Sequence, residues 1–142
     1  MLERKQIKDL IKTAIQMTKM SYAPYSHFQV GAALLAKNGN VYTGCNIENA
    51  AYTPTNCAER TAFFKAVSEG IREFTAIAVV GGPNGEISGL TAPCGVCRQV
   101  MMEFCDPKEF QVIMAVDESY YEIKTLEELL PMGFGPANLG LN

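Results

Sequence analysis

Apolar residues recur at two different spacings along this chain, and the two spacings predict alternating helices and strands. In residues 3–20 the apolar positions follow helical spacing, which predicts an amphipathic helix with one side facing a core. Residues 28–35 are almost continuously apolar over the length of a strand, which is typical of a buried strand. Asn38-Gly39 predicts a hairpin turn, and residues 41–45 would form the returning strand.

The rest of the chain continues this alternation. It predicts helices at residues 57–69, 94–105 and 125–130, and strands at residues 74–80, 110–116 and 120–124. Gly81-Gly82-Pro83 would end the strand at 74–80. We therefore expect a three-layer α/β/α sandwich in which helices cover both faces of one mixed sheet of about five strands. No internal repeat or long linker divides the sequence, so residues 1–142 are expected to form a single domain.

Composition and charge exclude several classes of partner. The chain is 48% hydrophobic and 19% charged, which is ordinary for a globular protein. Its net charge is −3 and its basic residues are scattered, which argues against a nucleic-acid partner bound through a basic face. No apolar run approaches the roughly 20 residues that span a bilayer, and the first residues lack the apolar core of a signal peptide. We expect a cytoplasmic protein, and an odd count of five cysteines agrees with reduced thiols.

Three of the cysteines lie in two short motifs, Cys57-Ala58-Glu59 and Pro93-Cys94-Gly95-Val96-Cys97. Zinc binds cysteine thiolates tetrahedrally, and a catalytic zinc keeps its fourth position for water. Three cysteines leave that position free, and Glu59 is placed to handle the protons of the water. The motifs therefore predict one catalytic zinc ion per chain, held by Cys57, Cys94 and Cys97, with Glu59 as the catalytic acid and base.

The charge of such a site requires compensation. Zinc with three thiolates carries a net charge of −1, which the partial positive charge of helix N-termini would offset. Arg60 and Arg98 each follow a cysteine closely, and we favour Arg60 as the donor of a hydrogen bond to sulfur. The combination of Cys-Ala-Glu with Pro-Cys-x-x-Cys is the signature of zinc-dependent nucleobase deaminases in their all-cysteine form. His27 lies outside the motifs and is expected to be a solvated loop residue.

At these motifs the sequence closely resembles the small, homotetrameric cytidine deaminases. The resemblance covers nearly the whole chain, including residues 22–26, 28–34, 44–52 and 127–134 as well as both zinc motifs. It implies the zinc-dependent hydrolysis of cytidine and deoxycytidine to uridine and deoxyuridine, with release of ammonia, in pyrimidine salvage. It also implies a nucleoside as the substrate and a homotetramer whose subunits share their active sites.

The resemblance further implies a set of substrate contacts: Phe28, Asn46, Glu48, Ala50, Tyr52 and Phe134. Asn46 and Glu48 correspond to residues that hydrogen-bond the ribose hydroxyls, and Phe28 to an aromatic residue beside the base. Judged from the residues alone, Asn46 and Glu48 would instead satisfy turn backbone, and Phe28 would pack in a strand.

Three of the implied contacts concern subunit boundaries. Phe134 corresponds to an aromatic residue that enters the site from the neighbouring subunit, and Ala50 and Tyr52 correspond to interface residues next to a neighbour's site. The Ala58 amide, at a helix start, is a candidate donor to the pyrimidine O2. In the mechanism that we expect, Glu59 takes the proton of the attacking water, then delivers a proton to N3 and later one to the departing amine.

Three alternatives remain open at this stage. The first is a deaminase of the same architecture that acts on free cytosine, guanine or a nucleoside antibiotic; Asn46 and Glu48 favour a substrate with ribose. The second is a structural zinc module, which needs a fourth ligand, for which Cys45 is the best candidate. The third is a deaminase of RNA or DNA, against which the net charge weighs.

Overall fold

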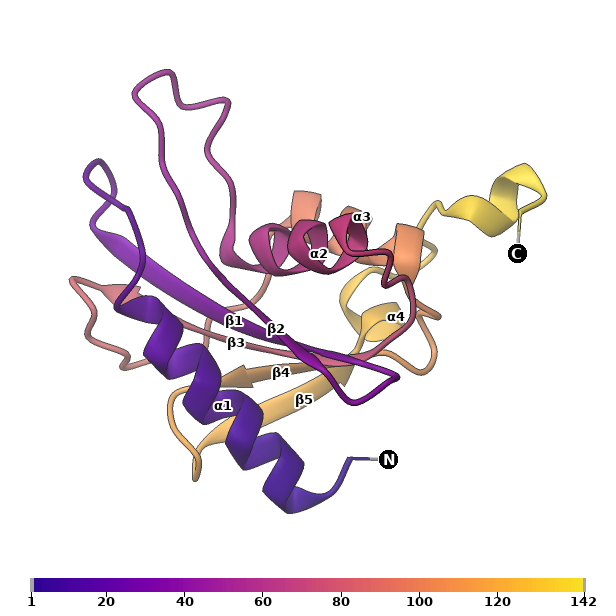
Figure 1. Ribbon diagram of the computed structural model, residues 1–142, viewed down its shortest axis with the longest axis horizontal. Coiled ribbons are helices and arrows are strands. Elements are labelled where there is room, and N and C mark those ends of the chain that lie inside the picture. The colour runs from indigo at the N-terminus through magenta and orange to yellow at the C-terminus, as the bar shows by residue number, and fades with distance from the viewer. Residues whose placement is uncertain (1, 142) are drawn as a thin grey trace.

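The computed structural model describes residues 2–141, and within that range the observed elements follow the expected order closely (Figure 1). The elements are α1 (Arg4–Thr18), β1 (Phe28–Ala36), β2 (Val41–Cys45), α2 (Ala58–Ser68), β3 (Phe74–Pro83), α3 (Gly95–Phe104), β4 (Gln111–Ala115), β5 (Tyr121–Thr125), α4 (Leu126–Leu129) and a 3-10 helix (Pro136–Leu139). The sequence did not predict the 3-10 helix. No helix within the described range has the length and apolar character needed to cross a membrane.

The sheet is mixed and has five strands in the order β2-β1-β3-β4-β5. Neighbouring strands run antiparallel except for β3 and β4, which are parallel and are connected through α3. A parallel pair needs a crossover connection, and a helix usually supplies it. The hairpin between β1 and β2 turns at Gly39, whose φ of 93° suits glycine. The predicted α/β/α sandwich with one mixed sheet is confirmed.

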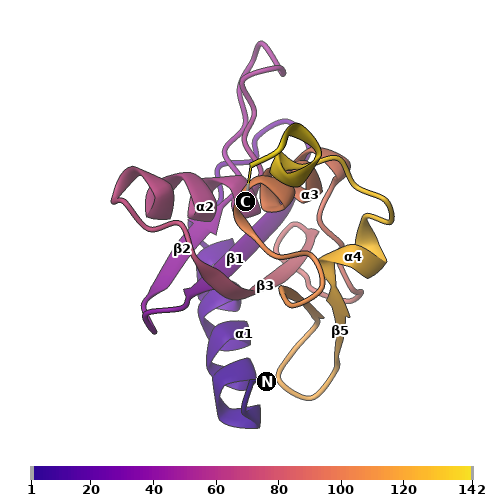
Figure 2. The ribbon, with the colours of Figure 1, turned by 90° about the vertical axis from the view of Figure 1, so that its right-hand side faces the viewer.

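Strand residues alternate between two apolar cores, one on each face of the sheet. Ala32 and Leu34 of β1 face the core that α2 and α3 cover, whereas Ala33 and Leu35 face the core beneath α1. Both faces are therefore buried, which explains the nearly continuous apolar sequence of these strands. Figure 2 shows the sheet between α1 on one side and α2 with α3 on the other.

One strand is longer than expected. The sequence predicted that Gly81-Gly82-Pro83 would end β3, but these residues continue the strand and pair with β1 from Val30 to Phe28. A side chain at Gly82 would lie 1.9 Å from the Glu86 carbonyl oxygen, so glycine permits a close backbone approach there. Pro83 is the last residue of the strand, where its missing amide is tolerated.

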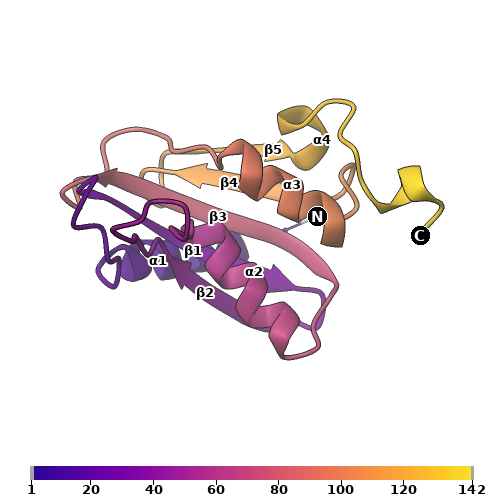
Figure 3. The ribbon, with the colours of Figure 1, turned by 90° about the horizontal axis from the view of Figure 1, so that it is seen from above.

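The helices α2 and α3 begin at the same edge of the sheet. β2 ends at Cys45, which pairs with Gly31 near the start of β1, and β3 ends at Pro83, which pairs with Phe28. The loops that leave these two strand ends lead into α2 and α3, which lie over the same face (Figure 3). The topology thus brings the first turns of two helices together, although Ala58 and Cys94 are 36 positions apart in the sequence.

Candidate active site and metal centre

Two of the motif cysteines are the N-cap residues of their helices. Cys57 precedes α2 with φ −75° and ψ 157°, and Cys94 precedes α3 with φ −68° and ψ 167°. The first amides of a helix have no partner within the helix and carry partial positive charge. The Cys97 amide uses this position to donate to the Cys94 Sγ at 3.5 Å. The start of α3 is therefore arranged to stabilise a thiolate at Cys94, whereas the Cys57 side chain accepts no cap hydrogen bond from α2.

The three sulfurs of Cys57, Cys94 and Cys97 lie within 4.8 Å of one another. Sulfurs bound at about 2.3 Å to one tetrahedral zinc lie about 3.8 Å apart, and the Cys57 and Cys94 Sγ atoms are separated by 3.7 Å. In the described part of the chain, no fourth thiol, imidazole or carboxylate joins this group within the same distance. The cluster therefore fits one zinc ion with three protein ligands.

The Cys45 thiol does not complete the cluster. Cys45 is the last residue of β2 and is buried, and its Sγ donates to the Met20 carbonyl oxygen at 3.4 Å. The closed four-cysteine site of the structural-module alternative is therefore not formed. Cys105 is likewise outside the cluster, and burial raises the pKa of its thiol.

Arg60 contacts the cluster as expected, and Arg98 does not. The Arg60 Nη2 donates to the Cys57 Sγ at 3.3 Å. A hydrogen bond from the Cys97 thiol, together with that guanidinium, lowers the pKa of Cys57 to about 5. Arg98 instead donates to the carbonyl oxygens of Pro93 at 2.8 Å and Leu129 at 2.6 Å, which ties α3 to α4. Arg60 therefore offsets the negative charge of the sulfurs, and Arg98 holds the helices together.

Glu59 lies in the first turn of α2, with only 4% of its surface exposed. Its carboxyl group is beside the Cys97 thiol, and burial raises its pKa to about 7. A divalent cation at the sulfurs would act in the opposite direction, because it favours the carboxylate. A buried acid next to the sulfurs has the placement of a proton carrier. Ala58 lies beside it in the same turn and is fully buried. The first hydrogen bond of the helix runs from the Thr61 amide to the Cys57 oxygen. The Ala58 amide precedes it and therefore has no acceptor within the helix.

Asn46 and Glu48 follow β2; the Asn46 side chain binds the backbone of β1, and the Glu48 side chain binds the loop before it. The Asn46 Nδ2 donates to the Phe28 oxygen at 2.7 Å, and its Oδ1 accepts from the Val30 amide at 2.9 Å. The Glu48 Oε1 accepts from the Tyr25 amide at 2.9 Å and from the Ser26 amide at 3.1 Å. A hydrogen bond from the Ser26 hydroxyl lowers the Glu48 pKa. Glu48 thus satisfies turn backbone, as its residue type alone suggested, whereas Asn46 satisfies the backbone of a strand.

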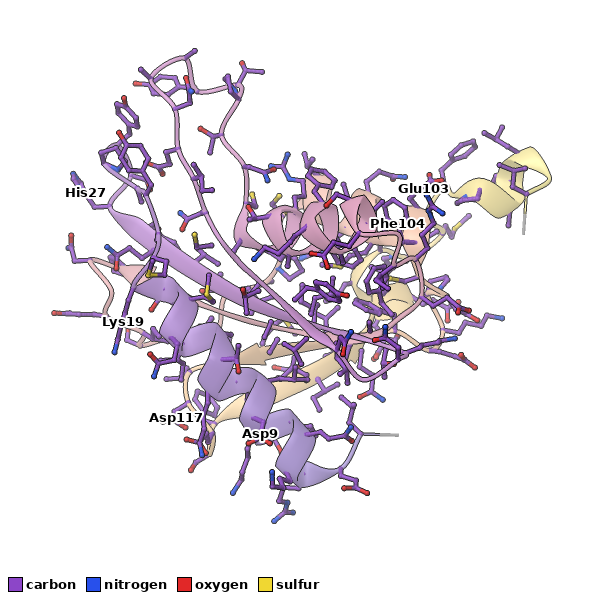
Figure 4. All side chains as sticks on the ribbon, in the orientation of Figure 1. Asp9, Lys19, His27, Glu103, Phe104 and Asp117 are labelled. Atoms are coloured by element: carbon purple, nitrogen blue, oxygen red, sulfur yellow. The ribbon has the colours of Figure 1, made fainter. Side chains whose placement is uncertain are left out.

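The other implied contact residues on this side of the molecule are exposed. Phe28 begins β1 with 37% of its surface exposed, although simple strand packing would have buried it. Ala50 and Tyr52 lie in the loop between β2 and α2; Tyr52 is 72% exposed, and its ring meets that of Tyr25 edge-on at 6.0 Å. His27 projects outward at the start of β1 (Figure 4), which agrees with a solvated loop residue.

Phe134 lies elsewhere. The C-terminal segment that contains it is at the opposite end of the molecule from the loops before β1 and α2 (Figure 1). Its backbone is fixed to α3, because the Gln99 Nε2 donates to the Phe134 oxygen at 2.8 Å, while 58% of its surface is exposed. The fold of one chain therefore does not bring Phe134 to the loops that hold Phe28 and Asn46.

Sequence reasoning missed Thr61. Its hydroxyl lies 3.0 Å from the Cys45 oxygen and 3.1 Å from the Cys57 oxygen, and it accepts from the Asn56 Nδ2 at 3.1 Å. The hydroxyl therefore connects the end of β2 to the start of α2. A threonine four residues after a motif cysteine was the available signal, because such a hydroxyl reaches the carbonyl one turn back.

Comparisons with known proteins identify the family. The family model described as the cytidine and deoxycytidylate deaminase zinc-binding region matches residues 4–114. A cytidine deaminase of Sporosarcina psychrophila is 49% identical over 133 residues, which cover 94% of each chain. A cytidine deaminase of Halalkalibacterium halodurans is 53% identical over 125 residues, which cover 88% of this chain and 91% of the relative.

Solved structures agree with this match. The crystal structure of cytidine deaminase from Burkholderia pseudomallei superposes with a TM-score of 0.81 at 47% identity, over 89% of this chain and 97% of that one. The crystal structure of cytidine deaminase from Mycobacterium tuberculosis has a TM-score of 0.76 at 38% identity, over 89% and 95%. The three-sulfur cluster falls within the matched zinc-binding region, and the chain therefore belongs to the zinc-binding cytidine deaminase family.

Proposed function

We propose that this protein hydrolyses cytidine and deoxycytidine to uridine and deoxyuridine, with release of ammonia, as a step of pyrimidine salvage. One observation carries the proposal: three cysteine sulfurs converge without a fourth protein ligand in the described chain, next to a buried glutamate. A closed structural site would give this glutamate no chemical role. An open site gives it one, because water can enter beside it.

The proposed ligands are Cys57, Cys94 and Cys97. When bound there, zinc supplies a Lewis acid that makes a water in its free position more acidic. Glu59 takes one proton from the attacking water and passes it to N3 of the pyrimidine. It then takes the second proton of that water from the new C4 hydroxyl and delivers it to the amino group, which leaves as ammonia while the C4 carbonyl forms. Its position in the first turn of α2, with the side chain buried, excludes bulk water from this proton transfer. Arg60 stabilises the negative charge of the Cys57 thiolate, because its Nη2 donates to the Cys57 Sγ at 3.3 Å.

The substrate would lie over the same edge of the sheet. The Ala58 amide has the position of a donor to the pyrimidine O2, since anionic or polar oxygens are stabilised at helix N-termini. Phe28 offers an exposed ring for the base. Asn46 and Glu48 would serve the ribose hydroxyls while they hold the loop and strand beside it, which makes them both scaffold and ligand.

We also propose a homotetramer in which each subunit contributes Phe134 to a neighbour's site, with Ala50 and Tyr52 next to that boundary. The exposure of all three residues and the distance of the Phe134 segment from its own loops support this arrangement. The sequence further supports one domain over residues 1–142. The free cysteines of the described chain support a reducing compartment, and we propose the cytoplasm.

The direct test uses purified wild-type protein. We expect one zinc per chain and turnover of cytidine and deoxycytidine, followed by the loss of their ultraviolet absorbance as uridine and deoxyuridine form. Cytosine should react far more slowly, because it lacks the ribose. Faster turnover of cytosine than of cytidine would move the proposal to a free-base deaminase.

Replacing Glu48 with glutamine separates its two roles. If Glu48 binds a ribose hydroxyl, kcat/KM for cytidine should fall about 10- to 100-fold, because a hydrogen bond to a charged group is lost. The loss for 2′,3′-dideoxycytidine, which lacks both hydroxyls, should be within about twofold. Equal losses on the two substrates would assign Glu48 to the loop of Tyr25 and Ser26 alone.

A further inference from the structure

The first turn of α2 rests directly on β2 at Gly44. A Cβ atom at Gly44 would lie 2.2 Å from the Ala58 oxygen and 2.6 Å from the Ala62 nitrogen. Carbon atoms do not approach backbone atoms so closely, so even one methyl group requires the helix to withdraw. Gly44 is not a turn residue, because it pairs with Ala32 within the ladder between β1 and β2. Its lack of a side chain therefore sets how near α2 lies to the sheet.

Hydrogen bonds between α2 and β2 also fix the position of the helix along the strand. Thr61, in the second turn of α2, bonds to the Cys45 oxygen, one residue after Gly44, and to the Cys57 oxygen. Further along, the Lys65 Nζ donates to the Thr43 oxygen at 2.6 Å. Three consecutive residues of β2 thus hold three successive parts of α2. The close approach at Gly44 fixes the distance of α2 from the sheet, and the hydrogen bonds fix its position along β2.

We infer that Gly44 and Thr61 are positioning residues for the reaction: they fix the turn that carries Cys57, Ala58 and Glu59. The inference rests on the proposed roles of Cys57 and Glu59. The sulfurs of Cys94 and Cys97 are carried by α3, so a shift of α2 alone changes the distance between the two halves of the metal site. Displacement by about 1 Å from a reactive geometry can cost about 100-fold in rate.

The chain offers a matched control on the opposite face of the sheet. A Cβ atom at Gly31 would lie 2.0 Å from the Ala14 oxygen and 2.8 Å from the Thr18 nitrogen, a clash as severe as that at Gly44. Gly31 stands against α1, which carries none of the proposed ligands. Gly31→Ala and Gly44→Ala should therefore lower the stability of the protein by similar amounts. Gly31→Ala displaces α1, whereas Gly44→Ala displaces α2.

The first experiment compares these two variants with wild type. For Gly44→Ala we expect kcat for cytidine to fall roughly 10- to 100-fold with a small change in KM, faster zinc release to a chelator, and an altered visible spectrum of the cobalt-substituted protein. For Gly31→Ala, zinc release and the cobalt spectrum should match wild type. Equal changes in both variants, or none in Gly44→Ala, would overturn the inference.

Thr61 provides a second test should Gly44→Ala not fold. Thr61→Val keeps the shape of the side chain and removes its hydroxyl. We expect kcat to fall about 5- to 50-fold and zinc release to accelerate, because the loss of a group that orients metal ligands lowers affinity or activity about 10- to 100-fold. Thr61→Ser restores the hydroxyl and should recover wild-type zinc release. Identical behaviour of Thr61→Val and Thr61→Ser contradicts the inference. Wild-type protein that binds no zinc would instead refute the proposed function.

Discussion

Replacing Glu59 with glutamine is expected to reduce kcat for cytidine by roughly 10²- to 10⁴-fold, the usual contribution of a positioned acid or base. Glutamine keeps the shape of the side chain but can neither accept the proton of water nor deliver one to N3. The zinc content should stay at one per chain, because the three sulfurs are untouched and Glu59 is outside their group. Steady-state kinetics with zinc analysis on the same sample checks both parts.

Glu69→Gln is the matched control, because this substitution makes the same change of charge at the exposed C-cap of the same helix. It should leave kcat within about twofold, as surface substitutions usually do little. If Glu59→Gln turned over cytidine at nearly the wild-type rate, Glu59 would have no part in the chemistry. If it lost zinc, its effect could not be assigned to proton transfer.

Replacing Cys57 with alanine should remove both metal and activity. Even groups that only orient metal ligands change affinity by 10- to 100-fold, so loss of a ligand should weaken zinc binding by more than about 100-fold. It also leaves the Arg60 Nη2 without its sulfur partner. Zinc retained after gel filtration, measured against protein concentration, should fall well below one per chain, and cytidine turnover should fall with it.

Cys45→Ala is the control that distinguishes the open site from a closed one. The Cys45 thiol bonds to the Met20 oxygen and stands apart from the three sulfurs, so this variant should keep its zinc and its activity. Loss of zinc from Cys45→Ala would restore the structural-module reading. A full zinc complement in Cys57→Ala would remove Cys57 from the ligand set.

The architecture was predictable because two signals agreed along most of the chain. Apolar runs of strand length and a helical spacing in residues 3–20 both describe elements buried on one or two faces. The prediction that the strand ends at Gly81 and Gly82 was wrong, because glycine is common both in turns and where strands approach closely. Only the strand that pairs with these residues shows which of the two applies. That partner, the start of β1, is about 50 residues away in the chain.

The metal cluster was predictable from spacing, and its surroundings were only partly so. Cys57 and Cys94 stood out because each preceded a helical pattern with a chemical motif. Arg60 donates to the Cys57 Sγ, whereas Arg98, which also lies about one turn after a motif cysteine, donates to backbone oxygens. Spacing alone therefore could not separate the two arginines. Thr61 and Gly44 carry no motif, and their contacts arise only when α2 packs on β2. The ribose contacts of Asn46 and Glu48 stay predictions, since the Asn46 side chain already binds β1 and the Glu48 side chain the loop before it.

X-ray absorption at the zinc edge tests the central claim most directly. The account predicts a first shell of three sulfurs and one oxygen or nitrogen in the purified, active protein, because three thiolates converge and the fourth corner is open to water. A first shell of four sulfurs, or an active preparation that contains no metal, would contradict it.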